Sequence, residues 1–444
     1  MKKPALIPIF VAGLLLSASS CFAQFFKIDT IFYSPSLKEY RKASIYLPHN
    51  YYQEHDCYYP AAYFLHGWGG NQNALDDKQM LMSILLNSGQ IDPMIIVCAD
   101  NSCQPFGTGV YVNSVITGNF EDFTIDDLIP FVDENFRTIP EKNARALFGH
   151  SLGAYGAFRL GILYKDMFRV ISAHAAPANY DLWMPAVRTM LMFENEGPPY
   201  YYDFYDNTGL NENQTAGFSN FFTKVMFLAS SGFSPDPNSS QTYINPPIVQ
   251  YPFNQYCQLI DSVYDKWHNF NIPLLISTLS PSDSLSIIYG CGLYDETLAY
   301  FPNFALQDTL TKYGISYKFV SHKANHQMPD SYFTESLMFI DSLLTDYSIY
   351  THTQHTGTSG QFVETYPNPF GNKLNVNLNL REQTSICLSL HDITGKQEIE
   401  LFEGMTDGFT QKMSFDTRHL EPGIYLLKLQ TPNHSETLKL IHGL

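Results

Sequence analysis

The chain has 444 residues, enough for two folded domains, and with 45% hydrophobic and 16% charged residues it is typical of a globular protein with a substantial core. Its formal net charge of -17 at pH 7 argues against nucleic acid or anionic lipid surfaces as partners. Aromatic residues reach 15%, which suits a core but also suits surfaces that stack on sugars or aryl groups.

The first residues have the pattern of a secretory signal peptide. A Lys-Lys pair precedes an apolar run over residues 5–16, and small residues at Cys21 and Ala23 predict cleavage after Ala23, which removes residues 1–23. The alternative is a lipoprotein acylated at Cys21, but the residues before that cysteine are a poor lead-in. The apolar run is short for a membrane span, so we expect a mature protein without one.

Export would allow the cysteines to oxidise. Six of the seven lie beyond the signal peptide, an even number that permits pairing but leaves the connectivity open: Cys57, Cys98, Cys103, Cys257, Cys291 and Cys387. Cys98 and Cys103 are close enough in sequence to close one loop, and Cys387 is a candidate for a free thiol. Their spacings form no CxxC pair, so we expect no metal site, and the sequence implies no cofactor.

Strand-like and helix-like patterns alternate from Phe25 to about Ser348. Short apolar runs rich in strand formers predict strands over residues 43–47, 61–65, 94–98 and 144–148. An i, i+3, i+4, i+7 spacing predicts a helix around Ile125, Leu128, Ile129 and Val132. Strands that alternate with helices indicate the α/β class, with a mostly parallel sheet covered on both faces, over residues 24–348.

One stretch, about residues 180–271, interrupts this alternation. It is rich in Tyr, Phe, Pro and Asn and indicates a long insertion, and long insertions in compact domains are often functional lids. Its aromatic cluster is flanked by polar residues, and we predict that these side chains bind substrate on the acyl or alcohol side of a pocket: Tyr200, Tyr201, Tyr202, Phe204 and Tyr205. The alternative is a purely structural elaboration.

The C-terminal part has a different pattern. Residues 349–364 form a polar stretch that predicts a flexible linker, in which His352 and His355 are expected to be solvated rather than to bind metal. From residue 365 to residue 444, apolar and polar residues alternate with period two, as in Leu374-Asn-Val-Asn-Leu378. About eighty residues of this kind predict a small antiparallel β-sandwich.

The segment Gly149-His-Ser-Leu-Gly153 matches G-x-S-x-G, the motif of a nucleophilic serine. The serine sits at a sharp strand-to-helix turn in a strained conformation, and the flanking glycines allow that turn. A predicted strand precedes the motif and a helical pattern follows it, which is the context that the short motif needs. We therefore predict Ser151 as a nucleophile, the alternative being an ordinary Gly/Ser turn.

A nucleophilic serine also needs N–H donors for the oxyanion. We predict the Leu152 amide as one donor, because it lies at the positive N-terminus of the helix after Ser151. The second predicted donor is the Trp68 amide, in the glycine-rich turn over residues 66–70 that follows a predicted strand. The alternative for that turn is a plain strand exit.

The serine further requires a base and an orienting carboxylate, which follow it in the order acid, then histidine. His326 lies in a polar loop after a strand-like segment and is the predicted base. His322 is a weaker alternative because it lies too near the strand end, and His174 precedes every good acid. Asp295, in a glycine-rich loop after a predicted strand, is the predicted acid, with Glu296 as the alternative.

At these motifs the chain resembles the putative-esterase family of α/β-hydrolases, which includes S-formylglutathione hydrolase, feruloyl and acetylxylan esterases, and mycolyltransferases. The resemblance spans about residues 30–345 outside the insertion and is carried by residues 61–70, 144–157, 292–295 and 326. It implies an α/β-hydrolase fold in which these stretches supply the oxyanion loop, nucleophile turn, acid and base. Ala154, and Ala324-Asn325 before the histidine, depart from glycines that are usual in the family.

The C-terminal residues resemble the sorting domain of the type nine (Por) secretion system. The resemblance is carried by residues 366–370, 392–396 and 420–428, whereas the ending over residues 441–444 lacks the usual basic terminus. It implies export through the periplasm and across the outer membrane of a Bacteroidetes-type bacterium, to the surface or the medium. The secretion machinery is then a partner.

The sequence as a whole predicts a secreted serine esterase that forms an acyl-enzyme on small-molecule or carbohydrate-linked acetyl or feruloyl esters. One alternative is an inactive hydrolase fold that binds carbohydrate through the aromatic insertion, and the filled triad positions argue against it. Another is acyl transfer to an acceptor other than water. The sequence leaves this second alternative open, because the first half-reaction is identical.

Overall fold

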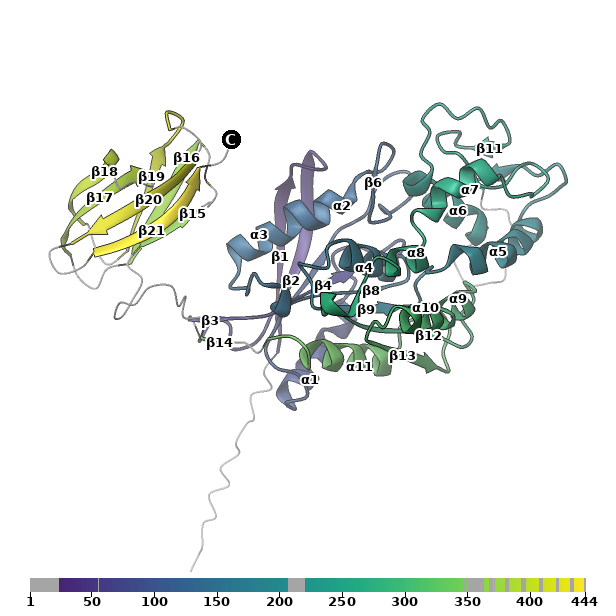
Figure 1. Cartoon of the computed structure of the whole chain (residues 1–444), viewed down its shortest axis with the longest axis horizontal. Coiled ribbons are helices and arrows are strands. Elements are labelled where there is room, and N and C mark those ends of the chain that lie inside the picture. Colours follow the sequence, from purple (N-terminus) through teal and green to yellow (C-terminus); the bar gives the residue numbers. More distant parts are fainter. Residues whose placement is uncertain are drawn as a thin grey trace, which may run out of the picture. The chain divides into compact units, whose positions relative to one another are not determined.

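The computed structural model describes residues 24–444 except 55, 207–219, 346–347, 350–362 and short C-terminal gaps at 367–369, 371, 380–382, 393–396, 407–409, 421–422, 432–434 and 443–444. The predicted signal peptide and most of the predicted linker, with His352 and His355, lie outside the described residues. The chain divides into two compact units whose main boundary follows Ile349 (Figure 1). Among the described residues, no helix has the length and apolarity that crossing a membrane requires.

The first unit is built on one eight-stranded sheet in the order β1-β2-β5-β4-β8-β9-β12-β13. The strands are β1 (Phe26–Ser34), β2 (Glu39–Leu47), β4 (Ala61–Leu65), β5 (Ile95–Ala99), β8 (Arg145–His150), β9 (Val170–His174), β12 (Ser286–Gly292) and β13 (Tyr317–His322). Strands β5, β4, β8, β9, β12 and β13 pair in parallel, and β1 and β2 extend the sheet in antiparallel fashion. The predicted α/β class with a mostly parallel sheet is therefore confirmed.

Helices cover both faces of this sheet (Figure 1). Phe64 and Phe148 point to one face and join an apolar cluster with residues of α1 and α11, whereas Leu147 and Ile171 lie against Gly161 of α4. The helices that flank the sheet are α1 (Gln79–Asn87), α2 (Phe120–Asp122), a π-helical segment (Phe123–Leu128), α3 (Ile129–Asn135), α4 (Leu152–Leu163), α8 (Ile272–Ile276), α9 (Tyr300–Phe304), α10 (Leu306–Lys312) and α11 (Asp330–Asp341). Successive side chains of a strand point to opposite faces of the sheet. Because helices bury both faces, nearly every residue of the central strands is apolar.

The insertion leaves the sheet after β9 and returns before β12, and its described part combines helices with irregular segments and one short strand pair. It contains α5 (Tyr180–Glu194), α6 (Phe221–Phe233), α7 (Asp261–His268) and a two-stranded parallel pair, β10 (Tyr202–Asp203) with β11 (Ile244–Asn245). The rings of Tyr180, Phe233 and Trp267 pack together within 5.3 to 5.8 Å between centroids. Much of its aromatic content therefore forms a core of its own.

The second unit consists of two antiparallel sheets, ordered β15-β16-β19 and β18-β17-β20-β21. Its strands are β15 (Val363–Tyr366), β16 (Lys373–Asn379), β17 (Ser385–Asp392), β18 (Gln397–Met405), β19 (Thr410–Asp416), β20 (Gly423–Gln430) and β21 (Ser435–His442). Alternate residues such as Leu374, Val376, Leu388 and Leu427 share one buried cluster. The period-two pattern thus produced the predicted small antiparallel sandwich.

Short strand pairs complete the first unit. These are β3 (Cys57–Tyr58) with β14 (Ser348–Ile349), and β6 (Asn113–Ser114) with β7 (Gly118–Asn119), both antiparallel.

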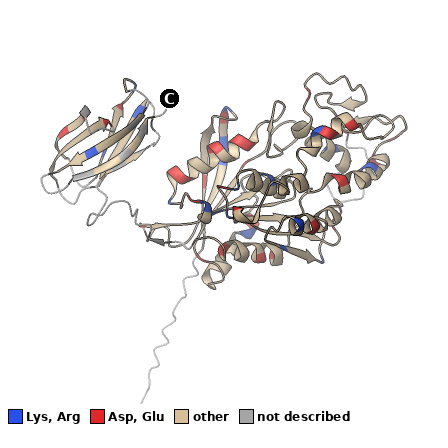
Figure 2. Ribbon diagram, in the orientation of Figure 1, with Lys and Arg blue, Asp and Glu red and all other residues tan. Residues whose placement is uncertain are grey.

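Figure 2 shows acidic residues in series along the α2–α3 segment, consistent with the negative net charge. A surface of that sign repels phosphate backbones.

The six described cysteines are all free thiols, so the loop closure that the spacing of Cys98 and Cys103 permitted is not formed. Cys98 lies in β5, and its side chain joins the apolar cluster beneath the sheet. Cys103 lies in the following loop and lines a surface cavity instead. Nearness in sequence did not bring the two sulfurs together, because the strand turns Cys98 into the core.

Candidate active site

The nucleophile motif forms a tight turn between β8 and α4. Strand β8 ends at His150, Ser151 has φ 57° and ψ -121°, and α4 begins at Leu152. A Cβ added to Gly149 would lie 2.4 Å from the Gly153 carbonyl oxygen, and one added to Gly153 would lie 1.8 Å from the Leu65 oxygen. Both glycines are therefore required by contact with backbone, and the left-handed serine stores strain of the kind found at functional sites.

The structure brings Ser151, His326 and Asp295 together. The Nε2 atom of His326 lies 2.8 Å from Ser151 Oγ, and its Nδ1 atom lies 2.9 Å from Asp295 Oδ2. These residues follow β8, β12 and β13, parallel strands of one sheet whose carboxyl ends meet at one edge. In this geometry the imidazole can accept the serine proton while the carboxylate orients the ring.

The carboxylate of Asp295 is fully buried and well supplied with donors. Thr297 donates to Oδ1 from its backbone N–H at 2.8 Å and from its hydroxyl at 2.6 Å, and the Cys291 thiol donates to Oδ2 at 3.2 Å. Burial raises the pKa of Asp295, but the hydrogen bond and charge of His326, with Thr297 and Cys291, outweigh it and lower this pKa to about 2. Asp295 is therefore ionised at neutral pH and suited to hold an imidazolium.

Glu296, the alternative acid, contacts the backbone of His326 rather than its ring. Its Oε2 atom accepts a hydrogen bond from the backbone N–H of His326 at 2.9 Å. The structure thus places Asp295 against the His326 ring and Glu296 against the His326 backbone.

The alternative bases His174 and His322 bond to each other rather than to the serine hydroxyl. Their Nε2 atoms lie 2.7 Å apart, and their rings stack with centroids 5.0 Å apart. Burial lowers the pKa of both, most strongly for His174, and so favours their neutral forms.

Sequence reasoning missed His150, the residue before the nucleophile. Its Nε2–H donates to the backbone carbonyl of His326 at 2.8 Å. Burial, with the neighbouring charge of His326, lowers the pKa of His150 to about 4, so the ring is neutral at pH 7. The only sequence signal was its place inside the G-x-S-x-G motif.

The two predicted oxyanion donors lie beside Ser151. Trp68 and Leu152 both line the cleft over the serine hydroxyl. Leu152 is the first residue of α4, where a helix leaves its backbone N–H without an intrahelical acceptor. Gly67 lets the turn before Trp68 approach closely, since a Cβ there would lie 3.1 Å from Ser151 Cβ. The Trp68 indole donates to the Phe106 carbonyl at 2.8 Å, which fixes the side chain.

The cleft over Ser151 has a cavity volume of about 50 Å3 and is narrow and mostly apolar. Its described lining combines residues of the main fold with residues of the insertion: Trp68, Ser151, Leu152, Ala175, Pro177, Trp183, Phe221, Val225, Leu228, Thr297, Ala299 and His326. The insertion therefore covers the serine through α5 and α6.

The aromatic cluster predicted to bind substrate is not part of this lining. Tyr200 and Tyr202 are buried, and Tyr202 stacks on Tyr251 at 4.7 Å between centroids and donates its hydroxyl to the Asn254 carbonyl. Phe204 packs against the Phe106 ring, whereas Tyr201 and Tyr205 are each 53% exposed. The insertion does reach the cleft, as expected, but with other side chains, because much of this cluster serves the insertion's own packing.

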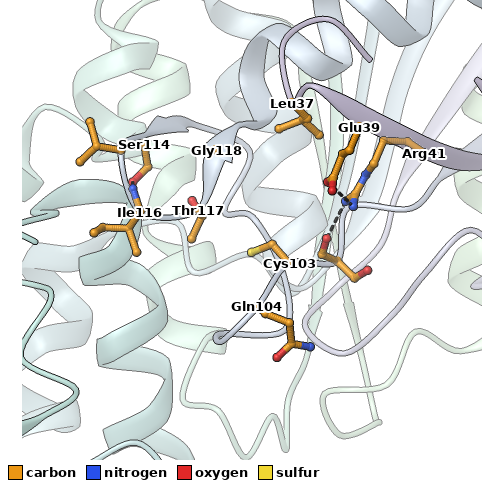
Figure 3. A pocket seen from close by; sticks show the side chains of 11 residues that line it. Leu37, Glu39, Arg41, Cys103, Gln104, Ser114, Ile116, Thr117 and Gly118 are labelled. Carbon is orange, nitrogen blue, oxygen red and sulfur yellow. Dashed lines mark hydrogen bonds and ion pairs between the residues drawn. The ribbon is translucent and has the colours of Figure 1, made fainter. Parts of the chain in front are cut away.

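A larger cavity of about 600 Å3 lies elsewhere in the first unit (Figure 3). Arg41 at its wall is paired with Glu39 at 3.0 Å and donates to the Ser102 carbonyl. Its described lining includes none of Ser151, Asp295 and His326, so size alone does not identify the reactive site.

Two regions of the chain each match a known protein family model. Residues 34–225 match the family model "Putative esterase", and residues 364–442 match "Secretion system C-terminal sorting domain". The first match includes Trp68 and Ser151 and ends before Asp295 and His326, so the acid and base depend on geometry. The sorting domain points to secretion or the cell surface.

Curated relatives share part of the chain. A protein named "Endo-1,4-beta-xylanase/feruloyl esterase" from Xylanibacter ruminicola is 33% identical over 146 residues, which is 31% of this chain and 20% of that protein. An esterase of Mycobacterium tuberculosis is 28% identical over 186 residues, 40% of each chain. The chain thus spans less than half the length of the curated relatives it matches.

Solved structures of similar proteins include a ferulic acid esterase with a TM-score of 0.48 and 18% identity, covering 72% of this chain and 99% of that one. Another is an S-formylglutathione hydrolase from Agrobacterium tumefaciens with a TM-score of 0.47 and 13% identity, covering 74% and 99%. The two family models carry the comparison instead. Residues 34–225 of this chain are similar to the putative esterase family, and residues 364–442 are similar to a C-terminal secretion sorting domain.

Proposed function

We propose that this protein is a secreted serine carboxylic-ester hydrolase with Ser151 as nucleophile, His326 as general base and Asp295 as orienting acid. The observation that carries the proposal is the hydrogen-bonded path from Ser151 Oγ through the His326 ring to Asp295, with steps of 2.8 and 2.9 Å. The esterase family match over the serine supports the same reaction class.

In the proposed reaction, His326 Nε2 takes the proton of Ser151 as Oγ attacks the ester carbonyl carbon. The amides of Trp68 and Leu152 donate to the oxyanion that forms. The protonated His326 then gives its proton to the departing alcohol oxygen, which leaves an acyl group on Ser151. Water, activated by His326 in the same way, releases the acid and restores the serine, while Asp295 remains ionised and stabilises each imidazolium.

We assign the substrates to carbohydrate-linked acetyl or feruloyl esters or similar small esters. The name of the relative from Xylanibacter ruminicola, a xylanase and feruloyl esterase, supports a plant-polysaccharide context. Export through the periplasm and outer membrane, with the secretion machinery as partner of the sorting domain, gives the protein access to such polymers.

Fluorophosphonate labelling of the full chain tests the proposal. A serine nucleophile should gain the mass of one probe, and Ser151→Ala should gain none and lose at least about 1000-fold in kcat/KM on 4-nitrophenyl acetate. Ser282→Ala, at an exposed serine outside the cleft, is the matched control and should retain labelling and activity. Labelling that persists in Ser151→Ala, or a wild-type protein that neither labels nor hydrolyses esters, would contradict the proposal.

A further inference from the structure

One face of helix α6 forms a wall of the cleft over Ser151. Phe221, Val225 and Leu228 follow one another at i, i+4 and i+7, so they share one side of the helix, and all three line the cleft. The opposite side of α6 is packed into the insertion, where Met226 is fully buried and the Phe227 ring lies 4.8 Å from that of Tyr251. The wall is therefore supported from behind.

The start of α6 is also anchored to the preceding helix. The Glu194 carboxylate, at the end of α5, accepts hydrogen bonds from the backbone N–H groups of Phe222 at 2.9 Å and Thr223 at 2.7 Å. These are first-turn donors that the helix itself leaves without partners, and a carboxylate is favoured at this end.

Helix α5 in turn is tied to the loop that carries the acid. The Trp183 indole N–H donates to the carbonyl of Thr297 at 2.8 Å, and Thr297 donates to Asp295 through its own N–H and hydroxyl. Trp183 also lines the cleft. The distance between the α6 wall and Ser151 is thus set by a continuous series of bonds rather than by a loose lid.

The chemistry of the cleft determines which part of an ester it can hold. Three side chains with polar groups line the cleft near Ser151 Oγ: Ser151, His326 and Thr297. Ser151 and His326 are hydrogen-bonded to each other, and Thr297 is hydrogen-bonded to Asp295. The walls contributed by the insertion are apolar apart from the Trp183 N–H, which is already bonded to Thr297. A sugar placed here would lose the hydrogen bonds that its hydroxyls make with water and gain few in return.

We infer that this cleft holds the acyl group of the ester, that its apolar walls favour the least polar acyl groups of the proposed substrate class, and that Val225 and Leu228 set the longest acyl group it accepts. This assignment rests on the proposed esterase function and specifies its substrate side. The alcohol of the ester then lies outside the apolar walls, where a hydroxylated leaving group keeps its contact with water. Since the carbonyl carbon is fixed at Ser151, each methylene of the acyl chain extends toward the α6 wall.

The test varies the acyl chain at constant alcohol, with 4-nitrophenyl acetate, butyrate and hexanoate and the full-length protein. Val225→Ala and Leu228→Ala remove methyl groups from the wall, and each should raise the ratio of kcat/KM for hexanoate to that for acetate at least about tenfold. Val225→Phe fills the same space and should lower this ratio by a similar factor. Opposite shifts from one position would establish that the wall sets chain length.

Val187→Ala is the matched control. Val187 lies in α5 and is fully buried in the insertion, yet it does not line the cleft, so its loss loosens the packing without enlarging the acyl space. Its hexanoate-to-acetate ratio should equal that of the wild type. An equal rise in Val187→Ala would mean that general loosening, not wall size, controls the ratio, and would overturn the inference.

Three further outcomes separate this inference from the proposed function. If wild-type protein labels at Ser151 and hydrolyses acetate but none of the three wall substitutions changes the ratio, the acyl assignment is wrong and the esterase proposal stands. If the substitutions change preference among acetyl esters of different alcohols instead, the cleft holds the alcohol. Absence of both labelling and hydrolysis in the wild type would contradict the function itself and the inference with it.

Discussion

The imidazole of His150 donates a hydrogen bond from Nε2 to the backbone carbonyl of His326 at 2.8 Å, so the residue before the proposed nucleophile holds the loop of the proposed base. The two residues are far apart in sequence, and this bond joins the turn after β8 to the loop after β13. The ring of His150 also lies 5.0 Å from that of His326, which limits how far the base can tilt. His150 is therefore expected to position His326 without touching substrate.

Two replacements of His150 should distinguish its hydrogen bond to the His326 carbonyl from the space that its ring fills. His150→Leu fills much of the space but leaves the His326 carbonyl without its donor, and we expect kcat to fall about tenfold or more with KM little changed. His150→Gln carries an amide that can supply the donor and should recover most of kcat. Equal kcat values for the two variants, measured with 4-nitrophenyl acetate, would show that the hydrogen bond is not what matters.

The two acids should respond differently to removal of charge. Asp295→Asn leaves the shape of the site but cannot favour the imidazolium, and we expect kcat to fall by about 100-fold to 10,000-fold. Glu296→Gln retains an oxygen that can accept from the His326 backbone N–H, so it should remain within a few-fold of the wild type. A larger loss in Glu296→Gln than in Asp295→Asn would reverse the assignment of the acid.

Stability should fall as the pH is lowered from about 6.5 to about 4. Unfolded His150 binds a proton below its ordinary pKa of 6.5, whereas the buried ring binds one only near pH 4, so the unfolded state takes up more protons in this range. The contribution is fully present above pH 6.5 and disappears as the pH approaches 4. Burial lowers the pKa of His66 and His174 and adds in the same direction.

Denaturant unfolding at a series of pH values measures this dependence. Each such histidine can add a slope of up to about 1.4 kcal/mol per pH unit. His150→Gln, which does not titrate, should show a shallower slope between pH 6.5 and 4 than the wild type. Below about pH 3.8 the remaining loss should come in part from Asp295, whose pKa is lowered to about 2 in the folded protein. Identical slopes in wild type and His150→Gln would refute the assignment to His150.

Neighbouring tyrosines of the insertion should differ in their effect on stability. Tyr202→Ala empties a fully buried site between Tyr251 and the Asn254 carbonyl and should lower the free energy of unfolding by about 3–5 kcal/mol. Tyr201→Ala, at a position that is 53% exposed, should change it by about 0.5 kcal/mol or less. Because Tyr202 does not line the cleft, its loss should affect small and bulky esters alike, and a loss confined to bulky esters would restore it as a substrate contact.

Much of the fold and of the candidate site could be predicted from local patterns. The strand, the turn at Ser151 and the following helix could be predicted from the G-x-S-x-G motif and the patterns on either side of it. Ser151 has a positive φ, and steric contact with backbone atoms leaves room only for glycine at positions 149 and 153. The order of acid and base along the chain then favoured Asp295 and His326 and left Glu296 and His322 as alternatives. These features depend on residues near one another in sequence, or on strand order that the α/β class already restricts.

Features that depend on distant contacts could not be predicted. The polar-flanked tyrosines suggested a surface, but Tyr202 is buried because Asn254 supplies a partner for its hydroxyl from fifty-two positions further along the chain. The spacing of Phe221, Val225 and Leu228 describes a helix face without indicating what it covers. The spacing of Cys98 and Cys103 likewise left their pairing open, because distance along a chain does not indicate to which face of the sheet a strand residue points.

The close contact of Gly153 with Leu65 has a consequence for how the sequence of this protein could change in evolution. A Cβ at position 153 would lie only 1.8 Å from the Leu65 oxygen, so α4 touches the end of β4 through backbone alone. The Leu152 amide lies at the start of α4, and the Trp68 amide lies in the turn that follows β4. The separation of these two amides therefore does not depend on the size of a side chain between α4 and β4. The wall of α6, in contrast, is made of side chains. If the proposed function holds, mutation of the α6 side chains can alter the cleft while Gly153 keeps the two proposed oxyanion donors at a constant separation.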